Sequence, residues 1–183
     1  MKRLFAIMMA LAMMLSLGVT AFAADTGTIT ITNARPEETY TLYKIFDAKV
    51  SDDVSNAGIV YYATPGSALA DELFGAAGTG KDYFDYDATT GVVTLGLKNG
   101  KTEAQLFEYL QTITNKTKVD EKDTGVGETT VKFENVPYGY YLVDPTNGAL
   151  VTVDSTRPNA EVQDKNQTTV TPDKTGEITW LYR

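Results

Sequence analysis

The sequence contains no cysteine and no histidine among its 183 residues. Without cysteine the chain cannot form a disulfide, which is the usual covalent cross-link of proteins outside the cell. The two absences together exclude thiol catalysis, imidazole acid–base chemistry and zinc sites built from Cys and His. Any covalent cross-link in this protein must therefore use other side chains.

Clusters of basic residues are also lacking. Acidic residues outnumber basic ones by 24 to 16, which gives a formal net charge of −8. Such an acidic balance argues against binding to nucleic acid and to anionic membrane surfaces. We expect neither of these partners, and the sequence indicates no cofactor and no metal.

The first 24 residues have the pattern of a signal peptide. Met1-Lys-Arg is a basic start, residues 4–19 are apolar, and Ala21-Phe-Ala23 is a small-residue cleavage site. The apolar run is too short for a comfortable membrane span. We therefore expect cleavage after residue 23 or 24 and export of a chain that begins near Asp25.

Residues 25–168 are expected to form one domain, followed by a tail at 169–183. Short runs of β-branched and aromatic residues between turn signals predict a mainly β fold, a β-sandwich with one or two short helical insertions. A polar, charged stretch at 115–128 is expected to be a loop. Strands are expected at 28–32, 38–50, 58–63, 92–95, 129–133, 140–144, 149–153 and 160–166, and helices at 68–74 and 103–114; the tail has a last alternating stretch at 178–182.

The strand at 38–50 has a lysine among apolar side chains. One of its faces carries Tyr40, Leu42, Lys44 and Phe46. A bare ammonium on a core face is costly to desolvate, so Lys44 must reach solvent, lose its proton or meet a partner. A lysine at a sheet edge that extends its amine into water is the simplest outcome.

Asp144 and Asn166 offer a second outcome if the first and last long strands are adjacent. A neutral Lys44 amine could attack the side-chain carbonyl of Asn166, so that a C–N bond forms and ammonia leaves. Asp144 would serve as the acid and base for this single-turnover reaction. The alternatives are a loop-capping residue before Pro145 for Asp144 and a strand-ending residue for Asn166.

Four stretches of the sequence carry a resemblance to a known family: Gly27–Asn33, Tyr40–Asp47, Val136–Asp144 and Gly148–Leu150. Together they resemble the N-terminal domain of sortase-assembled, Spa-type backbone pilins of Gram-positive bacteria. The resemblance implies an Ig-like, Cna B-like sandwich that acts as a structural, non-enzymatic subunit of a cell-surface pilus or fimbria. It also implies an isopeptide bond between Lys44 and Asn166, aided by Asp144, and a sortase and other pilin subunits as partners.

The same resemblance also implies how one subunit is linked covalently to the next. The family motif ends Tyr-Pro-Lys-Asn, and sortase joins its lysine to the next subunit. The matching stretch here, Val162–Asn166, lacks Tyr-Pro and implies Lys165 as the polymerising lysine; an ordinary surface lysine is the alternative. Thr171–Gly176 has one residue too many for the LPxTG sorting motif, so we expect no intact anchor of that type in this chain.

Other functions remain open at this point. A secreted adhesin module that binds a host protein or glycan would present an exposed groove, for which Tyr83, Phe84 and Tyr86 are candidates. A secreted hydrolase would need two carboxylates across a cleft. The acidic residues Asp82, Asp85 and Asp87 could bind calcium or simply flank a hairpin.

Overall fold

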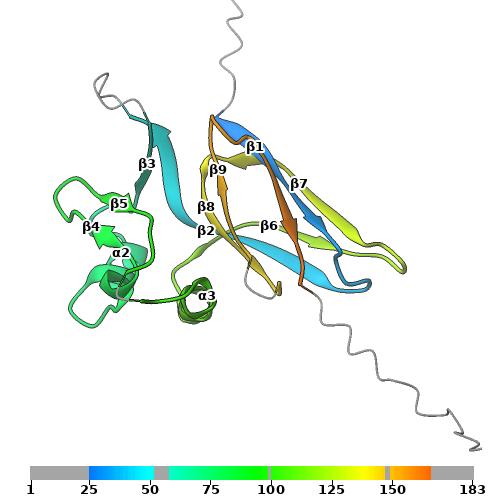
Figure 1. The fold of residues 1–183 in the computed structure, drawn as a ribbon, viewed down its shortest axis with the longest axis horizontal. Coiled ribbons are helices and arrows are strands. Elements are labelled where there is room, and N and C mark those ends of the chain that lie inside the picture. The colour runs from blue at the N-terminus through cyan, green and yellow to red at the C-terminus, as the bar shows by residue number, and fades with distance from the viewer. Residues whose placement is uncertain (1–24, 52–57, 99, 147–148, 166–183) are drawn as a thin grey trace, which may run out of the picture.

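The structure is a computed structural model that describes residues 25–51, 58–98, 100–146 and 149–165. It confirms the predicted class, since the fold is mainly β with two sheets and short helices (Figure 1). The expected signal peptide and the alternating stretch at 178–182 lie outside these residues. No helix in the described part of the chain is long and apolar enough to span a membrane. The elements are β1 (Thr26–Thr32), β2 (Thr39–Val50), β3 (Ile59–Tyr62), α2 (Ala68–Phe74), η1 (Gly80–Asp82), β4 (Asp85–Tyr86), β5 (Val92–Thr94), α3 (Glu103–Thr112), β6 (Thr117–Asp123), β7 (Thr130–Pro137), β8 (Gly139–Asp144), β9 (Leu150–Val153) and β10 (Asn159–Gln163).

The smaller sheet has the order β10-β1-β7, with β10 parallel and β7 antiparallel to β1. The larger sheet has the order β4-β5-β3-β2-β8-β9. Strand β2 pairs with β8 along one side, and along its other side it pairs first with β6 and then with β3. The chain between β3 and β6, residues 63–116, is therefore an insertion that leaves and rejoins the sheet at the middle of β2.

A hydrophobic core fills the space between the two sheets. The smaller sheet contributes Ile29, Ile31 and Phe133, and the larger sheet contributes Leu42 and Tyr141. Alternate residues of β1 point inward, because successive side chains of a strand face opposite sides of the sheet. This alternation is the one that predicted the strand at 28–32.

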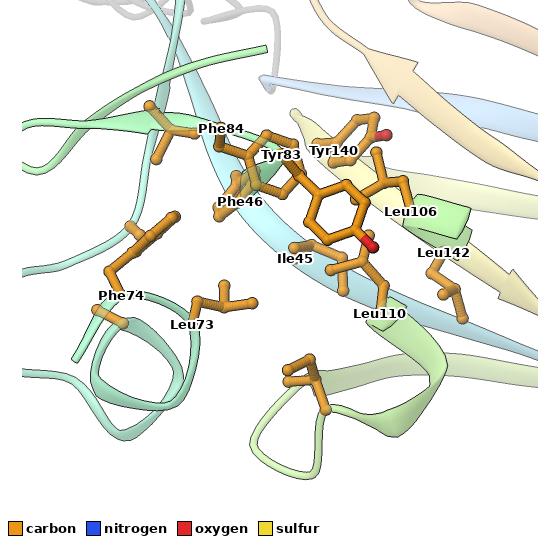
Figure 2. Packing of buried hydrophobic residues seen from close by; sticks show 14 of the residues in the cluster. Ile45, Phe46, Leu73, Phe74, Tyr83, Phe84, Leu106, Leu110, Tyr140 and Leu142 are labelled. Atoms are coloured by element: carbon orange, nitrogen blue, oxygen red, sulfur yellow. The ribbon is translucent and has the colours of Figure 1, made fainter. Parts of the chain in front are cut away.

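A second hydrophobic core lies between the larger sheet and the helices of the insertion (Figure 2). Phe46 lies at its centre, 1% exposed, with an edge-on contact to Phe84 at 5.0 Å between ring centroids. The rings of Phe74 and Tyr140 stack near it, at 6.3 and 6.0 Å. Aromatic rings in these arrangements gain stability beyond their buried area.

An irregularity in β2 brings Phe46 into the second core, which Ile45 already reaches by ordinary alternation. The pairing with β8 shifts register between Lys44 and Phe46. Before the shift, Tyr40 and Leu42 point into the sandwich core; after it, Phe46 points into the second core. A β-bulge has this effect because one extra residue reverses the side of the sheet that later residues face.

Both helices begin where the sequence predicted. The Ser67 side chain accepts a hydrogen bond from the backbone N–H of Ala70 and caps α2. At α3, Thr102 and Gln105 form a reciprocal capping box. The expected loop at 115–128 is wrong, because residues 117–123 form β6 and pair with β2. Its side chains are largely exposed and charged, which removed the apolar alternation that indicates a strand.

We predict that Phe46→Ala destabilises the protein by about 3–5 kcal/mol, the usual cost of emptying a core phenylalanine site. The loss should fall first on the insertion, because Phe46 packs against residues of α2, β8 and the segment before β4. Amide hydrogen exchange would show faster opening of α2 and α3 than of β1 and β7. Val50→Ala, at a position that is 58% exposed in the same strand, should leave exchange unchanged.

Candidate functional site at the end of strand β10

Lys44 lies at the edge of the sandwich core and forms an ion pair. Its Nζ donates to Oδ1 of Asp47 at 2.7 Å, and its side chain is 23% exposed. Its aliphatic stem passes over Gly139, where an added Cβ would lie 3.1 Å from the Lys44 Cδ. The ammonium thus meets both a carboxylate and solvent, and the burial problem posed by the sequence is largely relieved.

The structure does not place Asp144 beside Lys44. In the ladder between β2 and β8, Asp144 pairs with Thr41, whereas Lys44 pairs with Tyr141. The Asp144 carboxylate instead accepts a hydrogen bond from Nε2 of Gln111 at 3.2 Å. Each of the two described members of the expected triad therefore has a different partner.

The last strand lies next to the first strand and not next to β2. Strand β10 pairs with β1 from Thr28 to Thr32 and ends at Gln163, and Asn166 lies outside the described residues. Across the sandwich, the β2 side chain that touches the end of β10 is Tyr40, not Lys44. These two positions are four steps apart along the strand, a distance of about 13 Å. The Lys44–Asn166 bond therefore stays a prediction. No contact among the described residues brings Lys44 to the end of β10.

A fully buried carboxylate, Asp164, occupies the end of β10 instead. Its Oδ2 accepts a hydrogen bond from the Tyr40 hydroxyl at 2.7 Å and lies 3.7 Å from Nε of Arg35. Its backbone N–H donates to the Thr32 carbonyl, and its own carbonyl accepts from Nδ2 of Asn33, both at 2.9 Å. Among the described residues, Asp164 Oδ1 and Arg35 Nε have no hydrogen-bond partner.

This network joins several loops at one end of the sandwich. The Tyr40 hydroxyl also accepts from the Arg35 backbone N–H at 2.7 Å, and Nη2 of Arg35 donates to the Pro145 carbonyl. Burial raises the pKa of Tyr40 above its ordinary value, the Arg35 N–H opposes this, and the Asp164 carboxylate adds to it. The hydroxyl therefore remains protonated and keeps donating to Asp164.

The sequence predicted no role for Asp164, although the alternation of buried residues in β10 includes this position. Ala160, Val162 and Asp164 occupy alternate positions, and the first two point into the sandwich. Continued alternation predicts an inward carboxylate at 164. Its partners, Tyr40 and Arg35, come from the other end of the chain, and no local pattern indicates them.

Lys165 follows this fixed residue directly and is exposed. It lines a groove of about 540 Å³ that runs between the edge strands β9 and β10. The groove is also lined by Tyr140, Leu150, Glu161 and Val162. The expected polymerising lysine thus lies at the open end of a groove, directly after Asp164, whose backbone and side chain are both hydrogen-bonded.

Other expected site residues have structural partners. Tyr83 and Phe84 are 8% and 2% exposed and belong to the second core, so they do not form an exposed aromatic groove. The Asp87 carboxylate accepts hydrogen bonds from Thr89 and Thr90 in the following turn, and Asp85 pairs with Lys98. Within the described ranges, no three acidic side chains are grouped to hold a metal ion.

The geometry defines a two-sheet β-sandwich protein with a helical insertion. No protein family, curated protein or solved structure matches the chain. Its function must therefore be argued from the site itself.

The Lys44–Asn166 bond predicts that the purified mature chain is lighter than its calculated mass by one ammonia. The described contacts do not test this, because Asn166 lies outside the described residues and the Lys44 amine is paired with Asp47. Intact-mass spectrometry of the parent and of Lys44→Ala decides it. A parent at its full calculated mass would contradict the bond.

We predict that Tyr40→Phe destabilises the fold by about 1–3 kcal/mol, because the buried Asp164 carboxylate loses its hydroxyl donor. Chemical denaturation measures the change. Tyr138→Phe is the matched control, since it removes a hydroxyl from a half-buried tyrosine next to the start of β1, remote from Asp164. Equal stability of the two variants would show that the Tyr40–Asp164 hydrogen bond contributes nothing.

Proposed function

We propose that this protein is a structural subunit of a cell-surface pilus or fimbria that a sortase joins to the next subunit through Lys165. The observation that carries the proposal is the placement of Lys165, an exposed lysine beside a groove and directly after a residue fixed by its backbone and its side chain. The pilin-like stretches of the sequence and the signal-peptide pattern support the same proposal.

The arrangement suits an amine that must reach an enzyme-bound acyl group. Three hydrogen bonds hold the backbone and carboxylate of Asp164, so the position of the adjoining Lys165 backbone is restricted, and Lys165 itself is exposed. In the joining step, the Lys165 amine attacks the acyl carbon of a sorting peptide held by sortase. An amide bond forms, and the bond between that carbon and the enzyme breaks.

The proposal does not require a covalent cross-link within the domain. It also does not require an adhesive groove of aromatic residues, because Tyr83 and Phe84 are buried in the second core. The groove beside β10 is lined by two carboxylates, Glu103 and Glu161, which is the minimum that the hydrolase alternative requires, and Arg157 and Lys165 line the same groove. We propose the pilin role because the pilin-like stretches and the position of Lys165 support it, whereas no further observation supports a hydrolase.

The test is transfer of a labelled LPxTG peptide to the mature chain by pilus-assembling sortases. We expect one adduct, located at Lys165 by tandem mass spectrometry, and we expect Lys165→Arg to abolish it. Lys132→Arg, which alters an exposed lysine on β7, should leave the yield unchanged. Equal labelling of Lys132 and Lys165 by every sortase that labels the chain would refute the assignment.

A further inference from the structure

The groove between β9 and β10 lies at a seam where both sheets end. Strand β10 is the edge of the smaller sheet, and β9 is the edge of the larger sheet (Figure 1). A turn closed by the Asp154–Arg157 bridge connects the two strands. The groove is therefore closed at this turn and open at the other end, where β10 ends and Lys165 lies.

The outer edge of β10 offers backbone groups to another strand. The Thr28 N–H donates to the Pro158 carbonyl, and the Asp164 N–H donates to the Thr32 carbonyl. In a parallel ladder with this register, residues 160 and 162 direct their N–H and C=O groups toward β1. The N–H and C=O groups of Asn159, Glu161 and Gln163 consequently face away from β1, toward the seam.

The two seams of the sandwich differ in charge. At the opposite seam, strand β6 has the sequence TKVDEKD, and β7 carries Lys132 and Glu134. Charged side chains of this kind protect sheet edges from pairing with further strands. At the groove, β9 has the sequence LVTV and β10 has NAEVQ, so the two strands carry one charged residue, Glu161. Glu103, Arg157 and Lys165 line the groove from outside these strands. The edge strands of this seam therefore carry fewer charges than those of the other seam.

We propose that the segment Glu177–Tyr182 of the same chain adds to β10 as a further strand in this groove. The segment has the sequence Glu-Ile-Thr-Trp-Leu-Tyr. Its β-branched and aromatic residues, with Ile178, Trp180 and Tyr182 at alternate positions, favour an extended strand. Addition of an extended segment to an open sheet edge is a general mode of recognition. This inference does not depend on the role proposed for Lys165.

The chain length permits this arrangement. Residues 166–176 connect Lys165 to the segment, and 11 residues reach about 36 Å when extended. The five residues of β10 span about 16 Å. The connection is therefore long enough to turn at the open end of the groove and bring the segment back antiparallel to β10, with Glu177 beside Lys165.

The apolar side chains of the groove suit one face of the segment; Leu150 and Val162 are half-buried, and Tyr140 is 9% exposed. Tyr140, Leu150 and Val162 line the groove and are already packed against the two cores. Alternate residues of an added strand would point to the same side, so Ile178, Trp180 and Tyr182 would face them together. Burial of three large side chains supplies the driving force for such addition.

Trp180 reports on this proposal directly, because it is the only tryptophan of the chain. We expect its fluorescence in the mature chain to be blue-shifted and protected from acrylamide relative to the free peptide Glu177–Arg183. Glu161→Pro removes an outward N–H of β10 without touching the bonds to β1, and it should abolish the protection. Glu161→Ala keeps that N–H and is the matched control that should retain it.

Backbone amides give an independent measurement by NMR hydrogen exchange. In the mature chain we expect slow exchange at Gln163, whose N–H faces the seam, and fast exchange there once residues 177–183 are deleted. Ala160 and Val162, bonded to β1, should exchange slowly in both proteins. Their protection also shows that the fold survives the deletion.

Three results would overturn the proposal. The first is Trp180 as accessible in the mature chain as in the free peptide. The second is protection that survives Glu161→Pro, which would mean that the segment packs elsewhere. The third is protection that is lost on dilution and accompanies a dimer, which would mean that the segment adds to a second copy.

Discussion

Strand β2 takes part in both hydrophobic cores: Leu42 faces the sandwich core, Ile45 faces the second core by ordinary alternation, and the irregularity between Lys44 and Phe46 turns Phe46 to the second core as well. A strand with unbroken alternation could bury one face in the sandwich but could not turn an aromatic residue of that same face into the second core. The bulge also explains the position of Lys44. It is the last residue of the sandwich-facing series, placed where that core ends, so its ammonium reaches Asp47 and solvent. Helices, insertion and sandwich are thus held together through this one strand.

Local patterns predicted most of the elements and little of their assembly. Alternation found β1, β2, β8 and β9, and the capping signals found both helices. Alternation alone could not reveal the bulge, because an extra residue leaves no mark in the composition of β2. It also missed β6, an exposed edge strand whose pairing with β2 is specified by the partner and not by its own apolar residues. Which strand lies next to β10 is a property of the whole topology. The structure pairs β10 with β1, whereas the expected Lys44–Asn166 bond would need β2 to lie close to the end of the last strand.

The candidate site shows the same division. The inward position of Asp164 follows from the alternation of β10, but its partners Tyr40 and Arg35 are 124 and 129 positions away in the sequence. A buried carboxylate is costly unless donors surround it, and this one has the Tyr40 hydroxyl and the nearby guanidinium of Arg35. A leucine at 164 would bury as much surface, but it could not join the turn after β1, the start of β2 and the end of β10. The polar network thus fixes these three segments relative to one another, whereas an apolar side chain would only bury surface.

The location of this network bears on how a chain without cysteine could serve in a pilus. Strands β1 and β10 are parallel, so tension applied between the start of β1 and the end of β10 would shear their ladder. Under the proposed linkage, tension would pass from the Lys165 side chain into the chain that follows. It would bypass both strands, and the sandwich would carry little of the force. In that arrangement the domain needs only enough stability to keep Lys165 in place. The hydrogen bonds of Asp164, the residue immediately before that lysine, hold the domain at the point closest to the applied force.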